Sequence, residues 1–390
     1  MRKLIAVVLT LVISLQIVTL SITADSGKLP VDSEVKPTFD VAAKSAVLMD
    51  YNTGTVLYAK NENEALPPAS VTKVMTLLLI MEAIESGKLS LDDNITVSEN
   101  AASMGGSQVY LEVGESMRAD ELIKCVVIAS ANDAAVALAE AVAGSEGAFV
   151  SLMNKRANEL GMKNSSFENV TGLDDDTVNH LTSAFDIAIM SRELMKHKKI
   201  FEYSTLWMDS IRNGEFGLTN TNRLIRFYNG ATGLKTGSTS KAGFCISATA
   251  ERDGLHLIAV IMGSATRDER NNAAKALLDY GFANYSVFSA DSGCAGEIKV
   301  YGGNDTTLKG IYDKTEFLVT KGNEKQIKTE FSLPQELTAP IGKGTKIGEV
   351  SFKLGEETVH KCDIISDRDI EKISFGKQLL RMIGTFLLKY

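Results

Sequence analysis

The sequence predicts an α/β protein in which an antiparallel sheet is flanked by helices, followed by a small all-β domain and an amphipathic tail helix. Two observations predict the first domain: strand patterns surround turn residues at 45–60 and again at 244–263, and the stretch between them is helical in pattern. A third predicts the second domain, because short alternating segments separated by Gly and Asp turns begin near residue 286. A chain of 390 residues has room for both domains.

Residues 1–24 are predicted to form a secretory signal peptide. Arg2 and Lys3 precede an apolar run over residues 4–20, and small residues suited to cleavage follow up to Ala24. The alternative is a retained transmembrane anchor, because an apolar run of this length approaches what a membrane span requires. Both interpretations predict an exported protein on the outer face of the cytoplasmic membrane.

The first domain is predicted over residues 36–284. Strands at 45–50 and 55–60 surround an Asn-Thr-Gly turn, and a helix is expected from about Ser70 to Ser86 after two prolines. Sheet segments at both ends of the domain, with helices inserted between them, predict that the terminal strands pair with each other. The other expected elements are helices at 119–129, 133–143, 146–160 and 183–196, strands at 244–250 and 255–263, and a helix at 268–280.

The second domain is predicted over residues 286–366, with strands at 297–301, 316–320, 326–333 and 350–354. Residues 368–390 are predicted to form an amphipathic helix, regular from Ile370 onward. Bulky apolar residues fall on one side of its helical wheel and basic and polar residues on the other, as in helices that lie in a membrane interface. The alternative is a terminal helix docked on the β domain.

Composition argues against several other functions. Cys125, Cys245, Cys294 and Cys362 are far apart and give no disulfide framework. Four scattered histidines give no metal-ligand spacing, so no metal and no cofactor are expected. The net charge of -8, without a basic run outside the tail, argues against nucleic acid as a partner.

Three short motifs occur in the order typical of active-site serine acyl-transfer enzymes. They are Ser70-Val-Thr-Lys73, Ser130-Ala-Asn132 and Lys235-Thr-Gly237. Single motifs recur by chance, as Ser374-Phe-Gly-Lys377 in the tail shows. The context supports the set, because Ser70 opens a predicted helix, Ser130 separates two helices and Lys235 leads into a strand.

The chemistry of these residues is consistent with acyl transfer. Residues i and i+3 of a helix share a face, so Lys73 is expected beside the Ser70 hydroxyl. An amine accepts the proton of a serine only if burial or a nearby cation lowers its pKa, and Lys235 is a candidate for that cation. Ser130 is expected to relay a proton to the leaving amine, and Asn132 to hold the substrate amide.

The chain resembles the low-molecular-mass penicillin-binding proteins of the D-alanyl-D-alanine carboxypeptidase family, particularly the Gram-positive, sporulation-associated type. The resemblance extends from about Phe39 to the tail and implies a β-lactamase/transpeptidase-like first domain. It includes Gly106-Ser-Gln108, Asn169-Val-Thr-Gly-Leu173, His180-Leu-Thr-Ser183, Asn220-Thr-Asn222 and Gly233-Leu-Lys-Thr-Gly237.

The resemblance implies roles for particular residues. Ser70 would be the nucleophile and Lys73 the base, with Ser130 and Asn132 as the second motif. The backbone N–H of Ser238 would complete the oxyanion hole. The substrate-binding residues implied, by motif or by charge, are Asn132, Lys235, Thr236, Gly237, Ser238, Thr239 and Arg270, with Arg267 as a competitor for the role of Arg270.

The implied substrate is a peptidoglycan stem pentapeptide ending in D-Ala-D-Ala. Its free carboxylate would bind Lys235, Thr236 and Thr239, which places the last peptide bond over Ser70. Attack would expel D-alanine, and water would then hydrolyse the acyl-enzyme; another amine would make the reaction a transpeptidation. β-Lactam antibiotics would acylate the same serine, and the tail helix would bind the membrane surface.

Two other functions remain open at this point. A class A β-lactamase shares the three motifs but needs a glutamate to activate the deacylating water, and Glu168 is the nearest candidate. A catalytically silent peptidoglycan-binding protein would keep only the fold. His180 is expected to be a structural hydrogen-bonding residue near a helix cap rather than a catalytic one.

Overall fold

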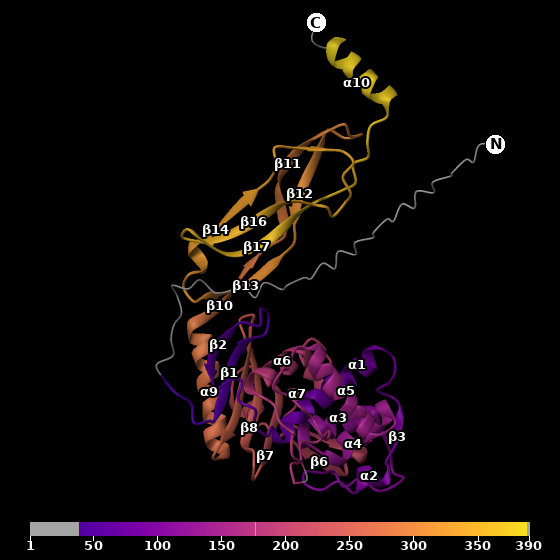
Figure 1. Ribbon diagram of the computed structural model, residues 1–390, viewed down its shortest axis with the longest axis vertical. Coiled ribbons are helices and arrows are strands. Elements are labelled where there is room, and N and C mark those ends of the chain that lie inside the picture. The colour runs from indigo at the N-terminus through magenta and orange to yellow at the C-terminus, as the bar shows by residue number, and fades with distance from the viewer. Residues whose placement is uncertain (1–38, 176, 388–390) are drawn as a thin grey trace, which may run out of the picture.

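The computed structural model describes residues 39–175 and 177–387. The predicted signal peptide at 1–24 lies outside the described residues. Figure 1 shows a first domain of helices packed on a sheet, a second domain of strands, and the helix α10 beyond it.

The first domain is built on a five-stranded antiparallel sheet with the order β2-β1-β9-β8-β7. The first strand of the domain pairs with the last, since Val47 of β1 lies opposite Val260 of β9, as predicted from the split sheet pattern. The strand β9 is apolar on both faces because helices cover the sheet from both sides. The strands are β1 (Ser45–Asp50), β2 (Val56–Lys60), β7 (Ala231–Thr239), β8 (Gly243–Arg252) and β9 (Leu255–Ser264).

Helices cover both faces of this sheet (Figure 1). The helix α9 (Arg267–Asn284) packs on one face through buried Leu277 and Leu278, and it begins with a capping box between Thr266 and Glu269. A helical subdomain lies on the other face. Its helices are α1 (Lys73–Glu85), α2 (Glu99–Ala102), α3 (Ala119–Lys124), α4 (Asn132–Ala143), α5 (Glu146–Glu159), α6 (Ala184–Leu194), α7 (Ile200–Ser204) and α8 (Leu224–Phe227).

Two helices predicted as continuous are divided, and in both the irregular turn contains or directly precedes a motif serine. The helix predicted from Ser70 begins as a 3-10 turn over Ala69–Thr72, and the α-helix starts only at Lys73. The helix predicted over 119–129 ends as a π-helical turn over Cys125–Ala129. The short strands β3 (Asn94–Thr96), β4 (Ser116–Arg118), β5 (Met208–Ile211) and β6 (Phe216–Thr219) form two hairpins in the subdomain.

The second domain contains a six-stranded sheet with the order β14-β16-β17-β12-β11-β15 and a separate pair, β10 and β13. Phe317, Val350 and Phe352 are buried in its core. Four of its strands were expected, and β10, β12, β15 and β17 were not. The strands are β10 (Tyr285–Ala290), β11 (Gly293–Tyr301), β12 (Thr307–Tyr312), β13 (Thr315–Thr320), β14 (Ile327–Ser332), β15 (Glu336–Thr338), β16 (Lys346–Leu354) and β17 (Glu357–Ser366).

The start of the tail corrects one prediction. Ile370 does not belong to the terminal helix: it is 1% exposed in the core of the second domain and exchanges backbone hydrogen bonds with Ile341. The helix α10 runs over Phe375–Leu387. Burial of Ile370 against its neighbours outweighs the helical periodicity of the isolated segment.

The described residues contain no single helix long and apolar enough to cross a membrane. The helices α4 and α5 reach the required length and hydropathy only together, and they are bent by 82° at their junction. Most of α4 is buried in the helical subdomain.

Candidate active site

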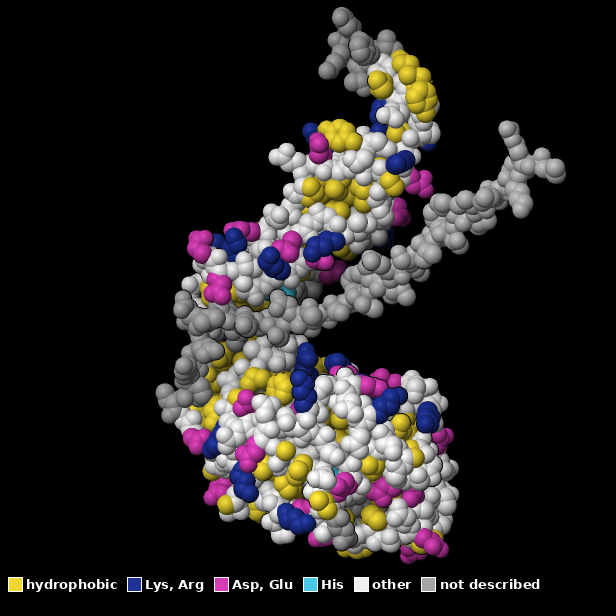
Figure 2. All heavy atoms as spheres, viewed as in Figure 1, with side chains coloured by type: hydrophobic (Ala, Val, Ile, Leu, Met, Phe, Trp, Pro, Cys, Tyr) yellow, Lys and Arg dark blue, Asp and Glu magenta, His cyan; other side chains and the backbone are white. Residues whose placement is uncertain are grey.

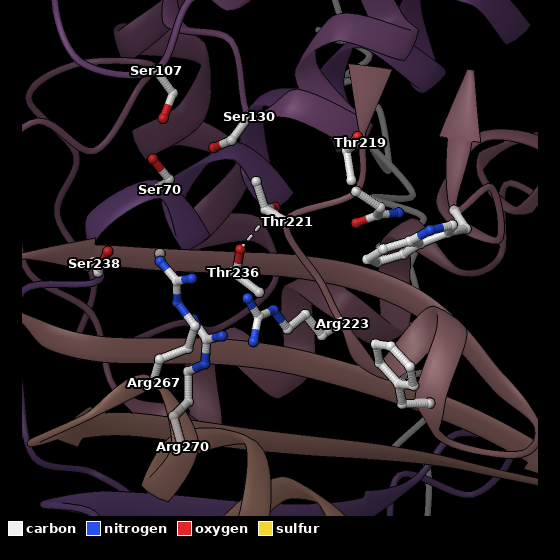
Figure 3. Close-up of a pocket in the computed structure, with 14 residues that line it drawn as sticks. Ser70, Ser107, Ser130, Thr219, Thr221, Arg223, Thr236, Ser238, Arg267 and Arg270 are labelled. Atoms are coloured by element: carbon white, nitrogen blue, oxygen red, sulfur yellow. Dashed lines mark hydrogen bonds between the residues drawn. The ribbon is translucent and has the colours of Figure 1, made fainter. Parts of the chain in front are cut away.

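A cavity of about 670 Å³ lies between the edge strand β7 and the helical subdomain. Figure 3 shows the hydroxyl groups of Ser70, Ser107 and Ser130 pointing toward one another at one end of it. Of the residues predicted from sequence, those that line the cavity are Ser70, Ser130, Thr236, Gly237, Ser238, Arg267 and Arg270.

Ser70 and Lys73 form the first serine–lysine pair. The 3-10 turn that precedes α1 places Lys73 Nζ 3.0 Å from Ser70 Oγ. The turn is entered through Ala69, whose φ of 50° lies in the left-handed region. A glycine at position 172 permits this, because a Cβ there would lie 1.9 Å from the Ala69 carbonyl oxygen.

The surroundings of Lys73 favour its neutral form. The side chain is fully buried, and burial together with the positive charge of Lys235 holds the pKa of its amine well below the usual range. The amine donates to Asn132 Oδ1 at 2.5 Å and to the Thr171 carbonyl oxygen at 2.7 Å. A neutral amine that uses both N–H groups in this way keeps its lone pair for the Ser70 hydroxyl proton.

Ser130 and Lys235 form a second pair, in which Lys235 Nζ donates to Ser130 Oγ at 2.8 Å. Ser130 terminates the π-helical turn with a φ of 64°, and this left-handed backbone turns its side chain toward the cavity. Lys235 is 1% exposed. Burial, with a contribution from the positive charge of Arg270, lowers the pKa of its amine to about 7.

The strand β7 lies directly against the turn that bears the first serine. A Cβ at Gly237 would be 2.7 Å from the Ser70 backbone nitrogen and 2.9 Å from the Pro68 carbonyl oxygen. Only glycine allows this approach, because a side chain would displace backbone atoms. Ser238 follows on the same strand and lines the cavity beside Ser70.

Three predicted residues have surroundings that differ from the expectation. Asn132 does not line the cavity, because its amide is held by Lys73 on one side and by the Gly105 carbonyl oxygen on the other. Lys235 does not line the cavity either, although its neighbour Thr236 does, and it reaches the site through its hydrogen bond to Ser130. Thr239 is absent from the wall and donates its hydroxyl to the Asp174 carboxylate, so its predicted place in a carboxylate-binding cluster is not supported.

Two residues important to the geometry were missed at the sequence level. Asp133 is buried, and its carboxylate accepts backbone N–H groups from Val109 and Leu111, which fixes the loop that contains Ser107. Its position directly after the S-A-N motif was the available signal. Arg223 lines the cavity as well, but no motif in the sequence identified it.

Glu168 and His180 have structural surroundings. Glu168 is exposed, and its two carboxylate oxygens accept the backbone N–H groups of Val178 and Asn179. It does not line the cavity, which removes the geometric basis for a water-activating role. The Nδ1 atom of His180 accepts from the Glu168 backbone, so its Nε2–H donates to Thr72 Oγ1 at 2.7 Å.

The fold and the paired serine–lysine site define a serine hydrolase of the penicillin-binding type. The chain matches the D-alanyl-D-alanine carboxypeptidase family of peptidases over residues 31–266 and the C-terminal domain of penicillin-binding protein 5 over residues 282–372. The chain therefore belongs to the D-alanyl-D-alanine carboxypeptidase family, which confirms the resemblance and the fold class predicted from sequence.

Relatives agree with this assignment over most of the chain. D-alanyl-D-alanine carboxypeptidase DacF of Bacillus subtilis is 42% identical over 350 residues, covering 88% of this chain and 89% of that protein. DacC of Escherichia coli is 32% identical over 346 residues, covering 86% of each chain. The crystal structure of penicillin-binding protein 5 from Haemophilus influenzae has a TM-score of 0.76 at 30% identity, covering 86% of this chain and 99% of that chain.

Proposed function

We propose that this protein removes the terminal D-alanine from peptidoglycan stem peptides through an acyl-enzyme on Ser70. The observation that supports this most directly is the presence of two serine–lysine pairs at one cavity. Lys73 lies 3.0 Å from Ser70 and Lys235 lies 2.8 Å from Ser130, and burial lowers the pKa of both amines. A serine peptidase whose base is a lysine needs an amine with a depressed pKa to activate its nucleophile at neutral pH.

In the acylation step, Lys73 accepts the Ser70 proton as Ser70 Oγ attacks the carbonyl of the penultimate D-alanine. The backbone N–H groups of Ser70 and Ser238 stabilise the oxyanion. The C–N bond then breaks, an ester forms on Ser70, and the leaving amine takes a proton through the Ser130 hydroxyl. Lys235 supports that transfer through its 2.8 Å hydrogen bond to Ser130.

Deacylation restores the enzyme. A water molecule attacks the ester and its proton returns to Ser70 through Lys73. The terminal carboxylate of the substrate is recognised by the cationic side of the cavity, near Thr236 and Arg270. A β-lactam presents a carboxylate and a strained amide to the same groups and acylates Ser70 in the same way.

We also propose that the protein is exported through residues 1–24 and rests on the membrane through α10. Several apolar side chains of α10 are solvent-exposed, including Phe375 at 81% and Leu380 at 70%. Figure 2 shows hydrophobic side chains gathered along this helix, at the far end of the second domain. An exposed apolar helix face of this kind is typical of interfacial helices.

The test of the catalytic proposal is intact-mass spectrometry after incubation with benzylpenicillin, together with D-alanine release from diacetyl-Lys-D-Ala-D-Ala. We expect an adduct on Ser70 and released D-alanine. Ser70→Ala should abolish both signals, and Ser374→Ala, in the chance motif of the tail, should change neither. Rapid penicillin turnover without D-alanine release would instead indicate a β-lactamase, and neither signal would indicate a silent binding protein.

A further inference from the structure

Two aromatic side chains lie next to the substrate cavity, on the side formed by the helical subdomain. Tyr110 is 66% exposed and lies three residues after Ser107, which lines the cavity. Phe216 is partly exposed and lies three residues before Thr219, another residue of the cavity wall, in β6. The rings of Tyr110 and Phe216 pack edge-on, with their centroids 6.4 Å apart. These two rings form an aromatic platform that joins two segments of the cavity wall.

The backbone of Tyr110 is the unusual feature of this platform. A single exposed aromatic residue is common on protein surfaces and needs no explanation. The φ of Tyr110, however, is 56°, in the left-handed region that a bulky side chain rarely adopts. Such a conformation persists only where surrounding contacts impose it, and it is found preferentially at functional sites. The exposed ring is therefore held in its position at a cost to the folded state.

Charged side chains from outside the loop impose this conformation. The buried Asp133 carboxylate accepts the backbone N–H groups of Val109 and Leu111, which flank the tyrosine. The Arg212 guanidinium donates to the Val109 and Tyr110 carbonyl oxygens at 3.0 and 3.2 Å. Because the loop is fixed from two sides by α4 and by the residue that follows β5, the Tyr110 ring is presented on a rigid support.

The chemistry of the platform suits a sugar ring. The C–H bonds on the face of a pyranose form an apolar, partly positive surface that packs on the negative face of an aromatic ring. The hydroxyl and acetamido groups at the edge of the sugar need hydrogen-bonding partners. Arg212 lies over the Phe216 ring, 5.7 Å from its centroid, and Asn213 and Glu215 are exposed in the turn between β5 and β6. The platform therefore combines an aromatic surface with polar side chains at its rim.

The position of the platform relative to the reacting bond also suits a sugar. In the proposed function, on which this inference rests, the substrate is a peptide whose N-terminus is joined to a glycan strand. Roughly four residues of the acyl part separate the reacting carbonyl from that strand, and they span at most about 14 Å. Ser107 points toward Ser70 in Figure 3, and the backbone from Ser107 to Tyr110 spans at most about 11 Å. A sugar attached to a bound stem peptide can therefore reach the platform.

A lipid surface is a less suitable occupant. Figure 1 shows β6 at the end of the first domain that is remote from the second domain, whereas α10 lies beyond the second domain. If α10 rests on the membrane, as proposed above, the platform lies at the opposite end of the molecule from the lipid. The glycan strand is then the part of the surroundings that the platform meets.

We propose that the aromatic platform, Tyr110 and Phe216, is a subsite for an N-acetylated hexosamine of the glycan strand to which the stem peptide is attached. Sugar binding there takes no part in the chemical step, so it stabilises the bound substrate and the transition state equally. The attached glycan should therefore lower KM and leave kcat unchanged. The enzyme prefers stem peptides attached to wall glycan over free peptides.

The experiment compares two substrates with the same reacting end, using D-alanine release by the purified protein. One substrate is a free stem pentapeptide with lysine at its third position. The other is the same peptide joined to the disaccharide N-acetylglucosaminyl-N-acetylmuramic acid. We expect kcat/KM to be about fivefold higher with the disaccharide, through a lower KM, as one aromatic contact would produce.

Tyr110→Asn should bring this ratio close to one, because asparagine accepts the left-handed backbone and only the ring is lost. Tyr110→Phe keeps the ring and should keep the ratio. The matched control is Tyr301→Asn, which removes a 55% exposed tyrosine from the second domain and should also keep the ratio. Penicillin acylation of each variant confirms that its site is folded. Tyr110→Gly, which also accepts a positive φ, takes the place of Tyr110→Asn if that variant is not acylated.

The outcomes separate this inference from the proposed function. D-alanine release with a disaccharide preference that disappears in Tyr110→Asn and remains in Tyr301→Asn supports the subsite. D-alanine release without that preference, or with a preference that survives the loss of the Tyr110 ring, overturns the subsite and leaves the carboxypeptidase intact. Absence of D-alanine release together with absence of acylation in the unmodified protein overturns both.

Discussion

At the scale of single residues, the site depends on two lysines kept in an environment that disfavours their charge. Lys73 and Lys235 are both buried, and each contacts the hydroxyl of a different serine. Burial of an ammonium group is unfavourable unless the proton is lost or shared. The cost is offset by fixed acceptors, such as Asn132 Oδ1 and the Thr171 carbonyl oxygen, which also hold Lys73 in position.

The first prediction concerns the coupling of these lysines. Lys235→Met removes a positive charge that lowers the pKa of Lys73, so that pKa should rise. The acid limb of the penicillin acylation rate should then move to higher pH, because a smaller fraction of Lys73 is neutral at any given pH. Stopped-flow or intact-mass kinetics across pH would measure this shift. Lys88→Met, at an exposed position, is the control, and an unmoved limb in Lys235→Met would contradict Lys73 as the base.

The second prediction concerns His180 and stability. Burial lowers its pKa from the ordinary 6.5 to about 4 in the folded protein. Between these values the unfolded chain binds more protons, so the free energy of unfolding should fall as pH drops from 6.5 to 4, by up to roughly 3 kcal/mol. His180→Gln should flatten this part of the curve in urea unfolding.

The same pH window contains a contribution from His256, whose pKa is also lowered to about 4. Part of the pH dependence of the free energy of unfolding should therefore remain in His180→Gln. An unchanged slope would mean that His180 does not lose its proton on folding. Catalysis by the variant at pH 7 tests the structural interpretation separately, because His180 donates its hydrogen bond to Thr72 and not to a residue of the serine–lysine pairs.

At the scale of elements, the active site is a contact between the edge strand β7 and the 3-10 turn before α1. The strand supplies Lys235 and Ser238, and the turn supplies Ser70. The two backbones can approach this closely only because residue 237 is a glycine, which has no side chain to contact the Ser70 backbone. The proposed oxyanion hole therefore depends on a spacing that a single methyl group would disturb.

The third prediction is that Gly237→Ala reduces the rate of penicillin acylation by at least about tenfold, because one oxyanion donor is displaced from the other. Intact-mass kinetics would measure the rate. Gly217→Ala on β6 is the control, since a Cβ there meets no atom within 4 Å. Equal rates in the two variants would mean that the close approach of β7 is not needed for catalysis.

At the scale of the whole molecule, the second domain separates the active-site domain from α10 (Figure 1). The helix α10 leaves apolar side chains exposed, while the segment before it, including Ile370 and Ile373, packs on the second domain. In the proposed anchoring, α10 would lie on the membrane and the second domain would hold the active-site domain away from it.

The fourth prediction follows from the correction at Ile370. A chain ending at Ser374 should lose binding to lipid vesicles and keep full penicillin acylation, because the second domain remains complete. A chain ending at Asp367 should also lower the melting temperature, because it removes buried Ile370. Co-sedimentation with vesicles and thermal unfolding distinguish the two effects. Continued sedimentation of the Ser374 chain would contradict α10 as the anchor.

The sequence by itself determined the order of the motifs, two hairpins of the sheet (β1–β2 and β8–β9) and the family. These are local signals: Asp253 and Gly254 suit the turn between β8 and β9, and Ser183 caps α6 with its side chain. Such features depend on neighbours in the chain, so they can be inferred without knowledge of the fold.

Tertiary structure alone decided the remaining features. Ser130 and Lys235 are 105 positions apart, and only the packing of β7 against the helical subdomain brings them into contact. Arg223 reaches the cavity, and Thr239 turns away from it toward Asp174, for the same reason. Ile370 lies outside the helix that its sequence pattern predicts. Its burial in the second domain stabilises the folded chain more than one additional turn of helix would. In each case the deciding contact lies far away in sequence, where local pattern contains no information about it.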